Sequence, residues 1–447
     1  METQIIDFNH AKLTDLVNMA LIASKSNGAT SAEADISVAT SKNVSVRLGN
    51  LETLEHNNDK SLTITVYVGQ RRGIASTSDF RSNAIDDCVK AACQIAKYTA
   101  EDSAFGLPEK SQFATSTKEL DLFHRWEADE SIMIEKALSC EDAALSFDGR
   151  IENSEGAQMS SSEAIFVYAN SSGFLGGFPS SRLSLGCSVV AKDSQGMQRD
   201  SAYSSVRSFD DLEDPTLIGR EVAQRVLKRL NPKPIKTGKY PVIFEAPIAT
   251  SFISSLVSAI SGGNLYRETS FLMGSIGSKI ASEALTISED PFLLRGNAST
   301  YFDDEGVKVE PRILVDKGVL EGYFLSTYSA RRLNMQTTGN AGGAHNLIVH
   351  PSGGGLESLI DNMGTGLVVT ELLGHGVNMV TGDYSRGAAG LWVEGGEIKH
   401  AVEEITIAGN LKSMLNNVVA VGDDTYKNSS KYTGSILISE MMIASNS

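Results

Sequence analysis

The segment 231–241 divides this chain into two parts. It holds three prolines and a glycine, which interrupt any helix or strand pattern. At 447 residues the chain is also too long for one ordinary hydrophobic core. We therefore expect an N-terminal domain over 1–230, a linker over 231–241 and a C-terminal domain over 242–447. A break near 100–130 would split the first of these into two subdomains.

The N-terminal part carries helix and strand patterns in turn. Apolar residues at helical spacing predict helices over about 9–27, 82–98, 128–147 and 214–230. Ser82 is expected to cap the second helix, Ile132 to point inward from the third, and Asp214 with Pro215 to open the fourth. Alternating apolar residues predict strands over 44–48 and 61–68. These elements predict an α/β domain of helices packed on antiparallel strands.

The C-terminal part changes character. A strand at 242–244 and a helix from about Pro247 to Ile260, ending at Gly262-Gly263, open it. Glycine is then frequent, and short strand-like runs recur at 313–315, 320–324, 367–372, 390–393 and 405–407. This pattern predicts a glycine-rich mixed or barrel-like β domain, and an α+β fold for the whole chain.

Composition excludes several classes of function. The net charge of -16 disfavours nucleic-acid binding, and the basic residues from Lys228 and Arg229 to Lys239 are interpreted as a solvated helix end and linker. No apolar run is long enough to span a membrane, and the first residues do not resemble a signal peptide. The four cysteines include no C-x-x-C pair. Free buried thiols in the cytoplasm are expected.

A search for catalytic motifs finds none. No H-E-x-x-H, G-x-S-x-G or phosphate-binding glycine loop is present. Glu371 and His375 are four residues apart, but one acid and one histidine do not make a zinc site. The acidic runs 303–305 and 403–404 are interpreted as solvated turns. No catalytic, cofactor-binding or metal-binding residue is therefore predicted from motifs.

A family resemblance covers nearly the whole chain. The segment 377–394 is similar to the signature of the PmbA/TldE branch of the TldD/PmbA family. Further segments match the family in the same order: 69–79, 261–267, 302–306, 338–342, 396–398 and 404–411.

The resemblance implies a two-subunit metallopeptidase. Its TldD-type subunit carries H-E-x-x-x-H and a cysteine near the C-terminus as zinc ligands. In this chain the corresponding positions hold Glu245, Ala246 and Thr250, and no cysteine follows Cys187. We therefore expect no metal in this chain and zinc in a TldD-type partner. An older family label, modulation of DNA gyrase, would be an indirect effect rather than DNA contact.

The implied division of labour leaves substrate contact to this chain. An edge strand beside the segment 382–387 would hold an unfolded peptide by strand addition. The alternative is that its glycines serve only tight turns. Arg386 would pair with a peptide carboxylate or with Asp383. The candidate substrate- or partner-contacting residues are Gly382, Asp383, Tyr384, Ser385, Arg386 and Gly387.

Two other functions stay open. The chain could be an autonomous metallopeptidase with an unrecognised metal site among His345, His350 and His375. It could instead be a regulatory or scaffold homodimer without proteolysis. The expected partners are a TldD-type subunit in a heterodimer, a second copy when the chain is isolated, and an unfolded peptide.

Overall fold

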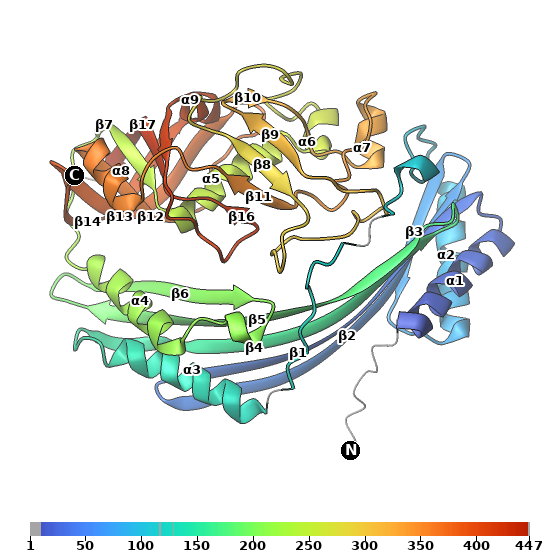
Figure 1. Cartoon of the computed structure of the whole chain (residues 1–447), viewed down its shortest axis with the longest axis horizontal. Coiled ribbons are helices and arrows are strands. Elements are labelled where there is room, and N and C mark those ends of the chain that lie inside the picture. The colour runs from blue at the N-terminus through green and yellow to red at the C-terminus, as the bar shows by residue number, and fades with distance from the viewer. Residues whose placement is uncertain (1–9, 116–117, 128, 446–447) are drawn as a thin grey trace.

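The N-terminal part is built on one long antiparallel sheet. A computed structural model describes residues 10–115, 118–127 and 129–445. The sheet has six strands in the order β3-β2-β1-β4-β5-β6 and curves beneath the C-terminal half (Figure 1). Its strands are β1 (Ser31–Arg47), β2 (Asn50–Val68), β3 (Arg71–Thr77), β4 (Ile151–Asn170), β5 (Leu175–Lys192) and β6 (Met197–Val206).

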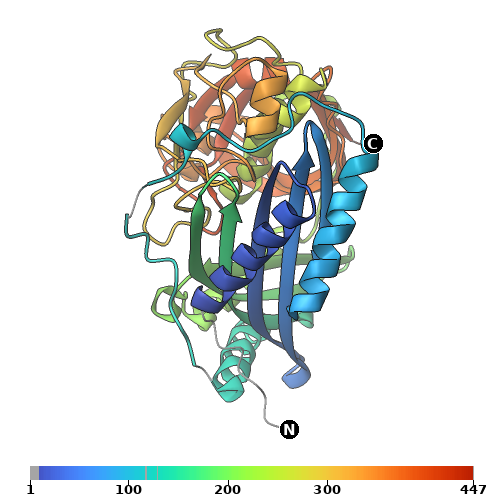
Figure 2. The same ribbon diagram turned by 90° about the vertical axis from the view of Figure 1, so that its right-hand side faces the viewer.

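Helices in two pairs cover the outer face of this sheet. They are α1 (His10–Ser26), α2 (Ser82–Tyr98), α3 (Glu130–Leu145) and α4 (Pro215–Lys228). Helices α1 and α2 lie side by side across one end of the strands (Figure 2), and α3 and α4 cover the other end. Strand β1 pairs with β4 from Glu33 to Val46, so both helix pairs pack on one continuous sheet.

Strand alternation explains this arrangement. In β1 the residues Ala32 to Val38 at even positions pack under α1 and α2, and Val44 and Val46 pack under α3 and α4. Side chains two apart share a face, so one face of a single strand supplies both cores.

Local helix predictions in this part had mixed outcomes. Asp214 caps α4 with Pro215 as its first residue, as predicted. The prediction for Ser82 was wrong, because it is the first residue of α2 and Arg81 occupies the cap position. Ile132 is 38% exposed rather than inward, since Met133, Ala137 and Cys140 form the buried face of α3.

The C-terminal half contains a closed five-stranded barrel, which confirms the barrel-like prediction. Strand β14 pairs with β13 on one side and with β17 on the other, and this second pairing closes the sheet. The barrel strands are β7 (Gly238–Phe244), β12 (Gly366–Leu373), β13 (Asp383–Glu394), β14 (Glu397–Asn410) and β17 (Ile436–Ser445), and β15 (Val418–Val421) extends the sheet beside β17.

A smaller sheet and short helices complete this half. The sheet consists of β10 (Val319–Leu320), β9 (Arg312–Asp316), β8 (Ile287–Asp290), β11 (Asn346–Val349) and β16 (Lys431–Tyr432). The helices are α5 (Ala246–Ala259), α6 (Gly262–Tyr266), α7 (Thr327–Arg332), α8 (Leu356–Met363) and α9 (Leu411–Asn416). Two predictions were wrong here. The strand expected over 320–324 ends at Leu320. Helix α5 ends at Ala259, and Gly262, which was expected to end it, is the first residue of α6.

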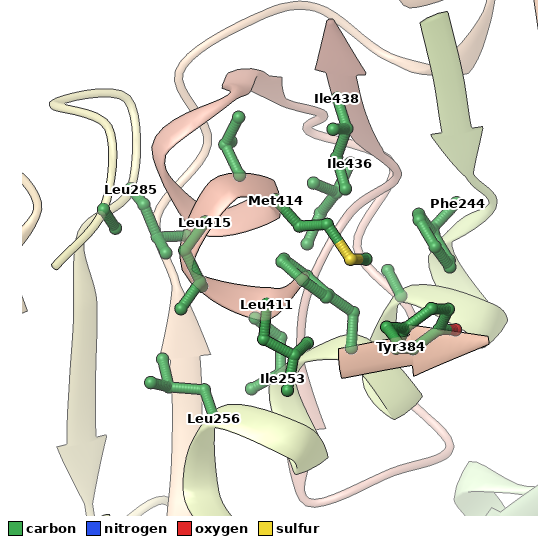
Figure 3. Close-up of a cluster of buried hydrophobic side chains, with 14 of the residues drawn as sticks. Phe244, Ile253, Leu256, Leu285, Tyr384, Leu411, Met414, Leu415, Ile436 and Ile438 are labelled. Carbon is green, nitrogen blue, oxygen red and sulfur yellow. The ribbon is translucent and has the colours of Figure 1, made fainter. Parts of the chain in front are cut away.

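Helix α5 packs its apolar face into the barrel core. Phe252, Ile253 and Leu256 are almost fully buried, and Phe252 stacks on Phe244 of β7. Figure 3 shows Ile253, Leu256 and Phe244 in this cluster. This packing fixes the start of α5 at the end of β7, on the side that faces the N-terminal sheet. None of the helices in the described ranges combines the length and the apolar composition that a membrane span requires.

Candidate functional site: two cavities that share Arg386

A cavity of about 600 Å³ lies where the N-terminal sheet meets the barrel. Strands β5 and β6 and helix α4 form one wall, and α5, β12 and β13 form the other. The charged residues on its walls are Glu155, Arg199, Asp200, Glu221, Arg225, Arg229, Glu371 and Arg386. We call this space the larger cavity. It brings together groups that lie more than 200 residues apart in sequence.

A network of ion pairs crosses the larger cavity. Arg225 of α4 binds both carboxylate oxygens of Glu245, with N···O distances of 3.1 and 3.2 Å, and its Nε lies 3.3 Å from Asp200. Arg229 pairs with Glu371 of β12 and lies 3.7 Å from Asp200. Such two-pronged arginine–carboxylate pairs are among the stronger polar contacts in proteins. The network therefore ties the N-terminal part to the barrel.

The sequence did not reveal this network. Arg229 was expected at a solvated helix end, but its side chain is only 13% exposed and its guanidinium is paired. Glu221 also faces the cavity, and burial raises the pKa of its carboxyl group. No local pattern links α4, β6 and β12, so these partners could be found only from the folded chain.

The three positions that the family resemblance aligns with a zinc motif lie at the start of α5, where Glu245 is the N-cap, Ala246 the first residue and Thr250 the fifth. The carboxylate of Glu245 is held by Arg225, as described above. Ala246 is buried, and its backbone N–H donates to Ser435 Oγ at 3.0 Å. The Thr250 hydroxyl donates to the Pro247 carbonyl at 2.7 Å. The three positions thus lie together at the N-terminal end of α5, and only Glu245 offers an ionisable side chain. Within the described ranges, no three His, Cys, Asp or Glu side chains are grouped so that they could hold a metal ion.

The segment 382–387 enters β13 and is paired on both edges. Residues 383–387 pair with β14, and on the other side Ser385 N donates to Gly376 O at 2.7 Å while Asn378 N donates to Asp383 O at 2.8 Å. The segment 382–387 itself therefore has no free backbone edge that a peptide could join. Gly382 has φ = 81°, which agrees with the alternative that it serves a tight turn.

The side chains of this segment divide between two faces. Asp383 is exposed and accepts hydrogen bonds from Thr381 Oγ1 at 2.6 Å and Asn410 Nδ2 at 3.1 Å. Tyr384 points into the barrel core near Phe244 (Figure 3), and burial raises the pKa of its hydroxyl to about 12. The prediction that Arg386 pairs with Asp383 was wrong, because Arg386 Nη1 donates to Ser251 Oγ at 2.9 Å. Of the six candidate residues, Arg386 is the one on the wall of the larger cavity.

A second cavity, of about 220 Å³, shares Ser251 and Arg386 with the first. We call it the serine-lined cavity. Its walls are Ser251, Ser254, Ser255 and Ser258 of α5 together with His375, Val377, Met379 and Arg386. The sequence did not reveal this cavity, although the four serines recur at the spacing of one helix face. Glu371 lines the larger cavity and His375 lines the smaller one, so the pair noted in the sequence serves two different places.

Comparison with known proteins places this architecture in a family. Three models of the PmbA/TldA metallopeptidase match the chain: domain 1 over residues 32–96, the central domain over 123–230 and the C-terminal domain over 237–445. A metalloprotease PmbA homolog of Haemophilus influenzae is 45% identical over 99% of this chain and 98% of its own length. The metalloprotease PmbA of Escherichia coli O157:H7 is 46% identical over 95% and 94%.

Solved structures agree with these matches. A Bacteroides thetaiotaomicron protein described as a candidate modulator of DNA gyrase is 28% identical, with a TM-score of 0.92 over 97% of this chain and 99% of that chain. Matching segments therefore run through both the long sheet and the barrel. On this evidence the chain belongs to the PmbA/TldD family of metallopeptidases.

Proposed function

We propose that this chain is the PmbA/TldE-type subunit of a two-subunit metallopeptidase that cleaves unfolded peptides, with the zinc held by a TldD-type partner. In this proposal the partner supplies the metal chemistry. This chain closes the space around the peptide and contacts it through Arg386. The proposal also sets the complex in the cytoplasm, and four buried free cysteines support a reducing compartment.

The observation that carries the proposal is the ion pair between Arg225 and Glu245. Zinc takes three or four ligands from His, Cys, Asp and Glu side chains. Here the motif positions offer one carboxylate, a buried methyl group and a hydroxyl, and that carboxylate already binds a guanidinium at 3.1 and 3.2 Å. A divalent cation at Glu245 would also be repelled by Arg225 and by nearby Arg229. These residues do not fit a zinc site, so no catalytic step is assigned to a metal in this chain.

A second function has support of its own. The curated relatives at 45% and 46% identity are named metalloproteases, which favours an autonomous metallopeptidase. Its ligands would have to lie outside the α5 turn. His345 is the most enclosed histidine to consider, but its Nδ1 lies 2.9 Å from Glu289 Oε1, in a contact that already involves Arg312.

The deciding experiment measures zinc content and cleavage of an unfolded peptide. Both are measured on this chain alone, on the TldD-type subunit alone and on the mixture. We expect the isolated chain to be free of zinc and inactive, and the mixture to be the active species. The control mixture contains a partner whose first motif histidine is replaced by alanine, and it should lose activity.

Each alternative has its own result. Stoichiometric zinc and cleavage by the isolated chain would replace the proposal with an autonomous enzyme, and His345→Ala, His350→Ala and His375→Ala variants would then locate the ligands. A stable complex with an intact target protein, formed without the partner and without cleavage, would support the scaffold homodimer.

A further inference from the structure

Arg386 is a cation without a counter-ion in the described part of the chain. Its Nη1 donates to Ser251 Oγ at 2.9 Å, and its Nε is buried without a well-aligned hydrogen bond, with the neutral hydroxyl of Tyr384 beside the guanidinium. The neighbouring carboxylates of Glu245 and Glu371 are taken by Arg225 and Arg229. A guanidinium has five N–H donors, and leaving a partly buried charge unpaired is unfavourable. The guanidinium of Arg386 can therefore bind a hydrogen-bond acceptor from outside the chain.

The serine-lined cavity surrounds this guanidinium with hydroxyl groups. Ser254 and Ser255 donate to the carbonyls of Thr250 and Ser251 at 2.7 and 3.1 Å, so their hydroxyl protons are already used. The hydroxyl protons of Ser251 and Ser258 have no acceptor among the described residues. They remain available to an anion held by Arg386.

The charge of this cavity favours a monoanion. A guanidinium matches one carboxylate with two parallel hydrogen bonds. A phosphate dianion would call for a second cation, but no other arginine or lysine among the described residues lines this cavity. Val377 and Met379 add apolar wall, which suits a side chain next to the carboxylate.

The volume of the serine-lined cavity favours the end of a peptide over a whole ligand. Its 220 Å³ is below the roughly 300–1,000 Å³ of sites that enclose a whole drug-sized ligand. Since Ser251 and Arg386 also line the larger cavity, a peptide whose end sits in the small space can continue into the 600 Å³ space beside it.

We propose that Arg386, with the hydroxyls of Ser251 and Ser258, binds the free C-terminal carboxylate of a peptide. The inference deepens the proposed function and rests on it for the identity of the ligand as a peptide. It adds which end of the peptide this subunit holds, and where.

The test compares one short unfolded peptide with its C-terminal amide, using calorimetric titration of the full chain without partner or zinc. We expect the free acid to bind at least about tenfold more tightly than the amide, because the lost contacts are charge-assisted. Arg386→Met should bring the two affinities within about twofold. Ser258→Ala, a smaller change that tests the site if the arginine variant fails to fold, should reduce the preference by a few-fold.

The matched control is Arg199→Gln. Arg199 lines the larger cavity but is 64% exposed and does not line the serine-lined cavity, so the preference should survive its loss. Acetate competition separates a small free carboxylate from a peptide end: we expect acetate to displace the peptide only at far higher concentration. Equal affinity of acid and amide, an unchanged preference in Arg386→Met, or displacement by inorganic phosphate as readily as by peptide would each overturn the proposal.

This test is independent of the proposed function. Cleavage by the isolated chain would overturn the subunit proposal while the preference for the free acid could still be measured with a non-cleavable peptide. Loss of that preference, with cleavage by the mixture intact, would overturn the carboxylate site alone.

Discussion

Replacing Arg225 by methionine should destabilise the chain because it leaves the largely buried carboxylate of Glu245 unpaired between α4 and the barrel. Asp200 would keep Arg229 at 3.7 Å, but Glu245 would lose its ion-pair partner. Breaking a buried pair by removing one partner costs about 3–5 kcal/mol. Since Arg225 and Glu245 are 18% and 19% exposed, the low end applies. We expect Arg225→Met to lower the free energy of unfolding by about 3 kcal/mol.

A double-mutant cycle isolates the contribution of the pair. Glu245→Gln alone leaves Arg225 with Asp200 and should cost about 1.5 kcal/mol, the lower range for a hydrogen bond to a charged group. The double variant has no orphaned charge at this point and should cost about 2.5 kcal/mol, which gives a coupling energy near 2 kcal/mol. A large coupling energy would mean that the two side chains depend on each other. The proposed function requires this, because it assumes that Arg225 holds the carboxylate of Glu245.

Urea unfolding followed by tryptophan fluorescence and circular dichroism measures these energies. Trp126 packs in the N-terminal part and Trp392 lies in the barrel, so fluorescence reports on both halves that the ion pair connects. Arg220→Met, on the exposed side of α4, is the control and should stay within about 0.5 kcal/mol of the parent chain. A coupling energy below about 0.5 kcal/mol would refute the reasoning, since Glu245 would then be satisfied equally well without Arg225.

Three further predictions concern pH, packing and thiol reactivity. Burial opposes ionisation of Glu289, yet hydrogen bonds from His345 and the charge of Arg312 hold its pKa at about 2 against the usual 4.5. Because the pKa of Glu289 is lowered in the folded chain, its ionised carboxylate stabilises the fold above pH 4.5, and this stabilisation is lost as the pH falls toward 2. In urea unfolding, Glu289→Gln should therefore lower the free energy of unfolding by about 3 kcal/mol at pH 7 and by clearly less at pH 3. An equal loss at both pH values would contradict this. A Cβ at Gly376 would lie 1.5 Å from the Ser385 carbonyl oxygen, so Gly376→Ala should force the loop after β12 away from β13. We expect a loss of about 1–3 kcal/mol in the same assay, and an unchanged stability would show that the loop moves freely. All four cysteines are buried, and burial raises the pKa of the Cys88 and Cys93 thiols, so Ellman's reagent should label none rapidly in the native chain and four after unfolding; rapid native labelling would contradict the buried placement.

Patterns within about twenty residues could be interpreted from the sequence. Alternation located β strands, and helical spacing located α1 to α5, because one face of each element is buried and its period is visible. The start of β2 was missed because residues 50–60 are exposed on both faces and show no alternation. The family was also determined by the sequence, through long segments such as 377–394.

The sequence alone could not determine the partners of the charged side chains. Arg386 and Asp383 are three apart, which suggests a contact on a helix, but in β13 their side chains leave opposite faces of the strand. Arg225, Glu245, Asp200 and Glu371 meet only because the long sheet folds back under the barrel.

The sequence by itself therefore determined most of the longer helices, several strands, the α+β class and the family, since local periodicity and long matching segments carry that information. Only the tertiary structure decided that Glu245 pairs with Arg225, and that Arg386 lines two cavities while no carboxylate of the described residues pairs with it. The physical reason is that an ion pair depends on a few ångströms of distance between groups, and that distance is set by how whole sheets and helices pack.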